Sequence, residues 1–341
     1  MALMLGIDIG GTKVAVGSVT QDGTVQGEIM DFLSPVGSPE EFVEALLEQL
    51  REARSRIKDD ILGVGVGCAG TIDWAERRVV ESPNLPLKDE LLGERIAKAL
   101  RLPVVLDNDA NTATLAEVRV GAAKGNSHVI MLTLGTGVGG GIVLDGRLYR
   151  GATGSAGELG HTIVKGNGDL CRCGRRGCLE QYASGSALER YARQIVDHGR
   201  LTSAAQGEDA ADAGADPPED YGRRLRELAA ADGLNGKSVG ELALEGDAAA
   251  RDAVAEVAAW LGAGLANLAN IFNPDMIVIG GGLSSLGDLL LEPARKLMEA
   301  HAIRPNGTVA QVAAAQLGNE AGVVGAALVA WEVLEDVTLP V

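Results

Sequence analysis

Short apolar runs alternate along the chain with longer segments in which apolar and charged positions recur at helical spacing. The runs are rich in β-branched residues and end in glycine or polar turns, which is typical of buried strands. We expect strands at residues 3–9, 14–19, 61–67, 104–107, 131–134, 142–144 and 276–279. The helical patterns predict helices at residues 39–57, 110–123, 184–198, 220–230, 247–271 and 320–334. The chain is therefore predicted to be an α/β protein.

Two strand–turn–strand segments are similar to each other. Residues 3–16 and 131–144 each consist of a predicted strand, a turn rich in glycine and threonine, and a second strand. This weak internal repeat predicts a duplicated α/β design with a cleft between two lobes, and 341 residues agree with about two domains. Residues 201–218 are biased to Ala, Asp and Gly without an apolar period, so we expect a surface insertion or mobile loop there.

The composition is that of a globular protein with an aliphatic interior. Hydrophobic residues make up 46% and charged residues 23%, which excludes wholesale disorder, while aromatic residues reach only 3%. The net charge of −17 repels nucleic-acid backbones, so we expect no nucleic-acid partner. We find neither a signal peptide nor an uninterrupted apolar run of about 18 residues, so we expect a cytoplasmic protein without a membrane contact.

The first glycine turn, Asp8–Lys13, has the residues of a phosphate-binding loop. Its glycines let backbone amides approach an anion, Thr12 supplies a hydroxyl, and Lys13 supplies a positive charge. The Asp8 carboxylate suits Mg²⁺ or its waters. A strand is predicted after the glycines, whereas a Walker A loop or a dinucleotide motif requires a helix there. The alternative is a plain β-hairpin turn without a ligand.

The second glycine turn, residues 135–141, supports the same interpretation. Its G-x-G-x-x-G spacing is a weak signal by itself, and a flexible hairpin is the alternative. Paired with the first turn, it predicts a second phosphate clamp with Thr136 as a candidate contact of the γ-phosphate.

Three of the four cysteines are close together in the sequence. Cys171, Cys173 and Cys178 lie within one stretch of eight residues, and His161 precedes Cys171 by ten. Three thiolates and an imidazole fill a tetrahedron around Zn²⁺ and leave no position for water, so we expect a structural zinc site. Chance clustering of free cysteines is the alternative. Cys68 is far away in the sequence and is predicted to be a small buried residue.

Carboxylates near these motifs are candidates for chemistry. Asp109 follows a predicted strand and precedes a predicted helix. It can cap that helix, or it can be a general base that takes a proton from a hydroxyl attacking phosphorus. Glu158 and Glu180 flank the zinc ligands and can either hold sugar hydroxyls or remain solvated at the surface.

In their order and spacing, these motifs resemble the ROK family of bacterial sugar kinases and sugar-responsive repressors. The most specific segment is His161 followed by Cys-x-Cys-Gly-x-x-Gly-Cys-x-Glu, which ends at Glu180. The resemblance implies an actin-like, hexokinase-type (ribonuclease H-like) α/β fold with two lobes and an interlobe cleft. We expect a small lobe of residues 1–116 plus 318–341 and a larger lobe of residues 117–317, which carries the zinc loop and the insertion.

The resemblance also implies a role for each matching residue. Asp109 matches the catalytic base, and ATP brings Mg²⁺. The sugar-binding positions are Asn84, Asn108, Glu158, His161 and Glu180. The nucleotide positions are Asp8, Gly10, Gly11, Thr12, Lys13, Gly135, Thr136, Gly137, Gly139, Gly281 and Gly282. The zinc ligands are His161, Cys171, Cys173 and Cys178, so one ring nitrogen of His161 serves zinc and the other is free to face the sugar.

Residues 180–185 look most like the glucokinase branch of the family, which implies ATP-dependent phosphorylation of the 6-hydroxyl of glucose. Kinases for fructose, allose, N-acetylglucosamine or N-acetylmannosamine, and a kinase that uses polyphosphate, are alternatives. So is a sugar-binding protein without catalysis. A sugar-responsive repressor is disfavoured, because only seven residues precede Asp8 and leave no room for a helix-turn-helix domain. The family implies a dimer or tetramer.

Overall fold

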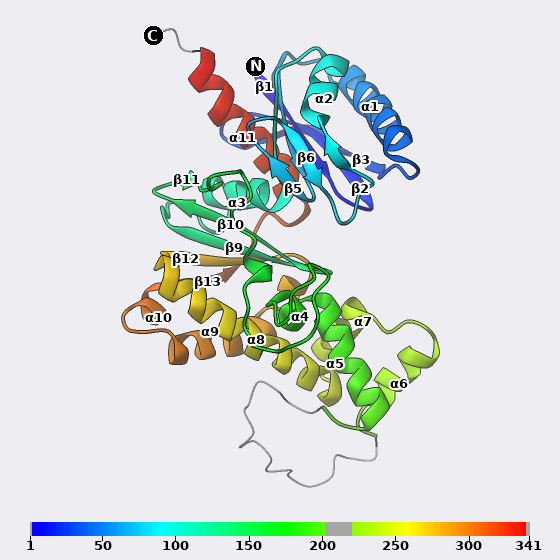
Figure 1. The fold of residues 1–341 in the computed structure, drawn as a ribbon, viewed down its shortest axis with the longest axis vertical. Helices are drawn as coiled ribbons and strands as arrows, with labels where there is room; N and C mark the ends of the chain where they lie inside the picture. Colours follow the sequence, from blue (N-terminus) through cyan, green and yellow to red (C-terminus); the bar gives the residue numbers. More distant parts are fainter. Residues whose placement is uncertain (1, 202–219, 339–341) are drawn as a thin grey trace. The chain divides into compact units, whose positions relative to one another are not determined.

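The computed structural model describes residues 2–201 and 220–338, which form two compact units (Figure 1). The first unit comprises Met1–Val129, Gly141–Gly157 and Gln316–Val341. The second unit comprises Ile130–Gly140 and Glu158–Ala315. Each unit has its own helices and its own set of the predicted motifs.

The first unit extends beyond the boundaries expected at residues 116 and 318. Helix α3 (Asp109–Arg119) packs against helix α11 (Ala321–Thr338), and this packing keeps both helices in one unit. A boundary after residue 116 would cut α3 in its last turn. The expected insertion at 201–218 lies, apart from Leu201, outside the described residues.

A five-stranded sheet lies at the centre of the first unit, with the order β3-β2-β1-β4-β8. The strands are β1 (Leu3–Ile9), β2 (Lys13–Val19), β3 (Val25–Leu33), β4 (Ile61–Cys68) and β8 (Val104–Asn108). β1 pairs antiparallel with β2 and parallel with β4, which in turn pairs parallel with β8. Parallel strands buried on both faces are apolar throughout, so the sequence pattern predicted β1 and β4 correctly.

Helices cover this sheet on both sides. Figure 1 shows α11 on one side and α1 (Pro39–Arg56) with α2 (Leu92–Leu100) on the other. Phe42 and Leu46 of α1 join the apolar strand residues in one buried core. At Gly65 of β4 a Cβ atom would lie 1.7 Å from the carbonyl oxygen of Ala326, so only glycine permits this close approach of α11.

The second sheet has the order β11-β10-β9-β12-β13. Its strands are β9 (Val129–Leu134), β10 (Val138–Leu144), β11 (Arg147–Leu148), β12 (Met276–Gly280) and β13 (Gln311–Ala314). Strands β9 and β10 flank the second glycine turn, so the predicted hairpin is confirmed. A small antiparallel sheet in the first unit comprises β5 (Thr71–Asp73), β6 (Arg78–Glu81) and β7 (Lys88–Glu90).

Helix α8 (Ala248–Phe272) is the core helix of the second unit. It packs against α4 (Glu180–Ala183), α5 (Gly185–His198), α7 (Gly236–Leu244) and α9 (Asp288–His301). Its length and composition would allow it to cross a membrane, but 67% of its apolar window is buried inside the protein, as in the core helix of a soluble protein. The other helical segments are α6 (Arg223–Ala230), α10 (Asn306–Val309), η1 (Leu159–His161), η3 (Gly282–Leu286) and η4 (Gly318–Glu320).

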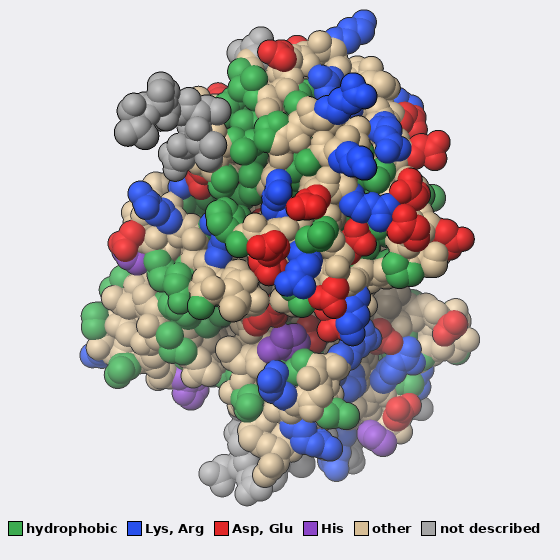
Figure 2. Space-filling view, turned by 45° about the horizontal axis from the view of Figure 1, so that its top comes forward, with side chains coloured by type: hydrophobic (Ala, Val, Ile, Leu, Met, Phe, Trp, Pro, Cys, Tyr) green, Lys and Arg blue, Asp and Glu red, His purple; other side chains and the backbone are tan. Residues whose placement is uncertain are grey.

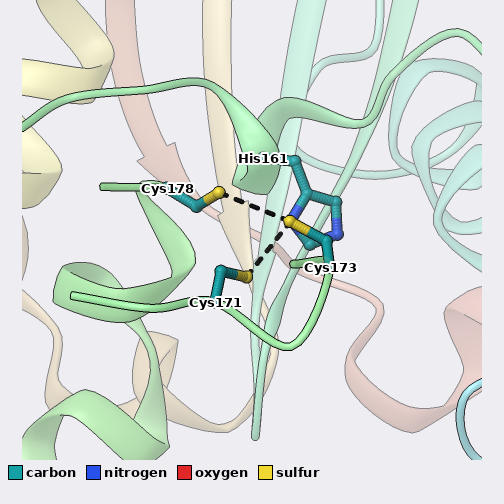
Figure 3. A group of neighbouring side chains, drawn as sticks. All are labelled: His161, Cys171, Cys173 and Cys178. Atoms are coloured by element: carbon teal, nitrogen blue, oxygen red, sulfur yellow. Dashed lines mark hydrogen bonds between the residues drawn. The ribbon is translucent and has the colours of Figure 1, made fainter. Parts of the chain in front are cut away.

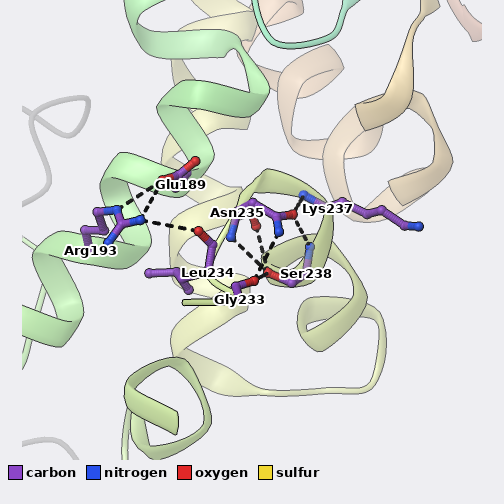
Figure 4. A network of polar contacts seen from close by, with 7 residues as sticks. All are labelled: Glu189, Arg193, Gly233, Leu234, Asn235, Lys237 and Ser238. Atoms are coloured by element: carbon purple, nitrogen blue, oxygen red, sulfur yellow. Dashed lines mark hydrogen bonds and ion pairs between the residues drawn. The ribbon is translucent and has the colours of Figure 1, made fainter. Parts of the chain in front are cut away.

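A polar network fixes the start of α7 (Figure 4). The Asn235 side chain caps the helix by accepting hydrogen bonds from the amides of Lys237, at 3.0 Å, and Ser238, at 3.1 Å. The Ser238 hydroxyl in return accepts a bond from the Asn235 amide, at 3.0 Å. Arg193 of α5 donates to the carbonyl oxygen of Leu234, at 3.4 Å, so the start of α7 is tied to α5.

Acidic and basic side chains are interspersed over the face that Figure 2 shows. In the first unit, Arg95 of α2 donates to Glu40, at 2.8 Å, and to Glu44, at 2.6 Å, so it joins α2 to α1. The hydrogen bond from Arg95 lowers the pKa of Glu40. Exposed pairs of this kind add little stability each, so they chiefly offset the local excess of negative charge.

Candidate active site

The first glycine turn connects β1 to β2 in the first unit. The Gly10 amide donates to the carbonyl oxygen of Lys13, at 2.9 Å, which closes the turn and leaves Gly11 and Thr12 exposed at its tip. The Lys13 ammonium lies 3.1 Å from a carboxylate oxygen of Asp31 on β3. This ion pair is partly exposed and therefore weak, so a phosphate can compete for Lys13.

Two half-buried carboxylates, Asp8 and Asp109, lie close to this turn. Asp8 is near the end of β1, and burial, reinforced by the negative charge of Asp109, raises its pKa to about 6. The nearby ammonium of Lys13 acts in the opposite direction. Burial also raises the pKa of Asp109, against a hydrogen bond of 2.9 Å from the Ala110 amide. Two interacting carboxylates in a buried position suit a divalent cation or proton transfer.

Asn108 caps α3. Its side-chain oxygen accepts from the amides of Ala110, at 2.8 Å, and Asn111, at 3.2 Å, and its nitrogen donates to the carbonyl oxygen of Gly70, at 3.0 Å. The helix cap is therefore Asn108, whereas Asp109, for which a cap was the alternative, is the first residue of the helix itself. The Asn108 side chain also hydrogen-bonds to the Asp109 carboxylate, which acts against the raised pKa of that group.

Sequence reasoning missed Asp107 and Arg150. Asp107 is 1% exposed, and one of its oxygens accepts from the Asn108 amide, at 2.8 Å, and from the Asn111 side chain, at 2.9 Å. Its other oxygen accepts from Nε of Arg150, at 2.7 Å, and the Arg150 guanidinium stacks 4.9 Å from the ring centroid of Trp74. A buried carboxylate needs a charged partner, and this need was the only indication of the pair before the structure was known.

Asn84 lies beside the first glycine turn. It follows β6 and is exposed, and a Cβ atom at Gly11 would lie 3.2 Å from Cβ of Asn84. The structure therefore brings Asn84 next to the phosphate-loop candidate, which its local sequence alone did not indicate.

The four predicted zinc ligands meet in the second unit (Figure 3). Their ligand atoms all lie within 4.8 Å of one another. Sγ of Cys173 lies 3.6 Å from Sγ of Cys178, and Sγ of Cys171 lies 3.7 Å from Nδ1 of His161. Sulfur and nitrogen ligands about 2.3 and 2.0 Å from a tetrahedral Zn²⁺ are separated by about 3.6–3.8 Å, so the four residues fit this metal. Cys68 is buried, as predicted.

The two ring nitrogens of His161 face different groups. Nδ1 lies on the side of the cysteine sulfurs, and Nε2 lies 3.9 Å from a carboxylate oxygen of Glu158. If Nδ1 binds the metal, Nε2 carries the proton and can donate it to a polar ligand beside Glu158.

Glu180 connects the zinc ligands with the second glycine turn. One carboxylate oxygen accepts from the Val138 amide, at 3.1 Å, and the other lies 3.6 Å from Sγ of Cys171. A Cβ atom at position 137 would lie 2.3 Å from the first of these oxygens, so a side chain there would displace the Glu180 carboxylate. Glu180 is therefore a fixed side chain, and the alternative of simple surface solvation is wrong for it.

The remaining nucleotide candidates also lie in the second unit. Gly135 and Thr136 form the tip of the second turn, and Gly139 lies within β10. Gly281 follows β12 and has a φ of 80°. A Cβ atom there would lie 2.6 Å from the backbone of Leu134, so Gly281, with Gly282 after it, packs against the end of β9. The structure thus divides the candidates: Asp8, Gly10–Lys13, Asn84, Asn108 and Asp109 are in the first unit, and the others are in the second.

Known proteins similar to this chain include several sugar kinases. A glucokinase of Streptomyces coelicolor is 40% identical over 97% of this chain and 98% of its own length. The crystal structure of a ROK family glucokinase from Streptomyces griseus in complex with glucose and AMPPNP has a TM-score of 0.79 and 40% identity, over 97% of this chain and 99% of that one. A ROK hexokinase from Thermus thermophilus has a TM-score of 0.75 and 31% identity, over 98% and 99%.

These likenesses extend over nearly the whole chain, and the α/β architecture is the actin-like, hexokinase-type fold that the resemblance implies. The profile of the ROK family matches residues 4–333. The chain therefore belongs to the ROK family.

Proposed function

We propose that this protein is an ATP-dependent glucokinase that transfers the γ-phosphoryl group of ATP to the 6-hydroxyl of glucose. The observation that carries this proposal is the likeness, over 97% of the chain, to a glucokinase structure that contains glucose and an ATP analogue. The buried carboxylates of the first unit support the reaction class, because phosphoryl transfer needs a base for the attacking hydroxyl and a held cation.

Asp109 is the proposed general base. Burial raises the pKa of Asp109, which makes its carboxylate a stronger base than one in water. Its position at the first turn of α3 holds it rigidly, since the Asn108 cap fixes that turn. Asp109 takes the proton of the 6-hydroxyl as the oxygen attacks the phosphorus atom.

Asp8 and the first glycine turn are proposed to hold the phosphates. Mg²⁺ bound with ATP neutralises phosphate charge, and the Asp8 carboxylate suits the ion or its waters. The exposed Gly11 and Thr12 offer backbone amides, with a hydroxyl from Thr12, to a phosphate oxygen. Lys13 adds the positive charge, and Gly10 permits the tight turn.

In the second unit, Glu158, Glu180 and Nε2 of His161 are proposed to bind sugar hydroxyls, together with Asn84 and Asn108 of the first unit. Charge-assisted hydrogen bonds that sugar hydroxyls donate to carboxylates hold a sugar in a defined orientation. Gly135, Thr136, Gly137 and Gly139 are proposed for the phosphates, and Gly281 and Gly282 for the adenosine side. Zinc held by His161 and the three cysteines has a structural role, because all four tetrahedral positions are filled.

The experiment that tests this function is an ADP-release assay with ATP and Mg²⁺ across glucose, mannose, fructose, N-acetylglucosamine and N-acetylmannosamine. We expect strong and selective turnover with glucose. Selective turnover of another sugar would replace the proposed substrate, and turnover only with polyphosphate would replace the donor. Absence of turnover in a folded, zinc-loaded protein would contradict the proposal.

The same proposal includes a cytoplasmic homo-oligomer, dimer or tetramer, without a nucleic-acid or membrane partner.

A further inference from the structure

Three hydrogen bonds fasten the second glycine turn to residues 180–186. The Glu180 carboxylate accepts from the Val138 amide, at 3.1 Å. The Gly185 amide donates to the carbonyl oxygen of Gly135, at 2.7 Å, and the Ser186 hydroxyl donates to the carbonyl oxygen of Thr136, at 2.9 Å. A glycine-rich turn has many accessible backbone conformations, so bonds of this kind decide which one is populated.

The same segment begins at the zinc site. Glu180 is two residues after the zinc ligand Cys178. The Leu179 amide donates to the carbonyl oxygen of Thr162, at 2.9 Å. Residues 180–186 are therefore tied to the zinc loop at one end and to the glycine turn at the other.

A second bond ties α4 to the middle of the zinc loop. The amide of Asp169 donates to the Tyr182 hydroxyl, at 2.6 Å, and the Tyr182 ring packs on Trp260 of α8 with the ring centroids 4.7 Å apart. The loop that carries the cysteines is thus fastened to α4 as well as by hydrogen bonds within itself, such as that from the Cys171 amide to the carbonyl oxygen of Arg175, at 2.7 Å. Metal binding to such a loop adds free energy that orders it further.

Support for the other end of the segment is independent of the metal. A Cβ atom at Gly236 would lie 2.6 Å from the carbonyl oxygen of Gly185, so the capped start of α7 packs directly on Gly185. Without the metal, Glu180 would lose the ordered zinc loop that precedes it. Gly185 would keep its contact with the start of α7. The expected effect on the glycine turn is a partial loss of order.

We propose that residues 180–186 couple the zinc site to the nucleotide-binding turn, so that zinc raises the affinity for nucleotide as well as for sugar. Glu180 and Ser186 are positioning residues for this turn, and the zinc loop acts through them. The proposal rests on the proposed nucleotide role of residues 135–139. All the residues involved belong to the second unit.

The first arm of the test measures the affinity for MgADP by calorimetry without sugar. We expect Ser186→Ala to weaken MgADP binding about three- to tenfold, the effect of one lost hydrogen bond, with glucose affinity unchanged. Ser186→Thr, which keeps the hydroxyl, should bind like the wild type. The matched control is Ser55→Ala, which removes an exposed hydroxyl that donates to the carbonyl oxygen of Glu52, at 2.7 Å, in the first unit.

The second arm removes zinc with a chelator and restores it. We expect weaker binding of both MgADP and glucose without zinc, and recovery when zinc is added back. The zinc-dependent change in MgADP affinity should be smaller in Ser186→Ala than in the wild type, because the variant has already lost part of the connection. Equal changes in both proteins would mean that Ser186 acts independently of zinc, and would overturn the proposal.

The coupling and the proposed function can be contradicted separately. If the wild type binds glucose and MgADP, but zinc removal and Ser186→Ala leave the MgADP affinity unchanged, the coupling is wrong and the proposed function stands. If the wild type binds neither ligand, the proposed function fails and the coupling fails with it. Zinc content and circular dichroism of each sample show whether a loss of binding comes from unfolding.

Discussion

Asp109 and Asp8 are two half-buried carboxylates of the first unit, and the pKa of each is raised. The negative charge of Asp109 contributes to the raised pKa of Asp8. Burying two like charges costs folding free energy. A protein keeps such a pair where a ligand or a reaction uses it, which makes these residues the first to test.

Asp109→Asn removes the proposed base and keeps the shape of the side chain. We expect kcat to fall by about two orders of magnitude or more, since general-base catalysis contributes about 10²–10⁴-fold. Zinc content should stay close to the wild type, and the melting temperature of the ligand-free protein should not fall, because the variant removes a desolvated charge. The measurement is steady-state turnover of glucose, and near-normal turnover would remove Asp109 from this role.

Asp8→Asn tests the cost of burying a charge. The folded-state pKa of Asp8 is raised from 3.8 to about 6, so the folded protein binds this proton more tightly than the unfolded chain. Its contribution to stability is therefore present below about pH 4 and is lost as the pH rises through about 6. We expect Asp8→Asn to stabilise the ligand-free protein at pH 7.5, on the order of 2 kcal/mol, and to lose this advantage at pH 4.

Chemical denaturation at the two pH values measures this difference, and turnover measured on the same samples should be strongly reduced. An unchanged or lower stability of the variant at pH 7.5 would show that the Asp8 carboxylate is better solvated or better paired than its burial indicates.

At the scale of elements, Asp107 and Arg150 hold three segments of the first unit together. Asp107 is the penultimate residue of β8 and accepts a bond from Asn111 of α3. Arg150 lies in the segment after β11, and Trp74 follows β5. Removing one partner of a buried ion pair leaves an uncompensated charge, which typically costs about 3–5 kcal/mol.

Arg150→Met should therefore be strongly destabilising, because the buried Asp107 carboxylate loses its charged partner. The double variant Asp107→Asn/Arg150→Met removes both charges, so we expect it to be more stable than Arg150→Met alone. Urea unfolding of the two single variants, the double variant and the wild type gives the coupling free energy. Strictly additive effects would contradict the importance of the pair.

Much of the local structure could be predicted from the sequence, because it depends on neighbouring residues. The glycine turns, the strands β1 and β4 and the cysteine set follow from residue type and spacing. The long-range partners could not be predicted in this way. Arg150 and Asp107 are 43 residues apart, and Ser186 and Thr136 are 50 apart. Each of these bonds depends on how whole elements pack, which no local pattern encodes.

At the scale of the whole molecule, all the proposed sugar-binding residues of the second unit depend on the zinc site. Cys173→Ser removes one of four ligands, so we expect zinc to be lost and the loop between His161 and Cys178 to loosen. Glucose affinity should fall with it, because Glu158, His161 and Glu180 flank or belong to this loop. Zinc content by atomic absorption and glucose binding by calorimetry measure both effects. Retained zinc with a normal KM for glucose would contradict the structural-site assignment.

The central claim is the transfer of a phosphoryl group from ATP to the 6-hydroxyl of glucose. Its most direct test follows ADP release and product together, with the product detected by glucose 6-phosphate dehydrogenase. The account predicts glucose-dependent ADP release with one glucose 6-phosphate formed for each ADP, and its loss in Asp109→Asn. A zinc-loaded, folded protein that releases no ADP with glucose, or that releases ADP without forming glucose 6-phosphate, would contradict it.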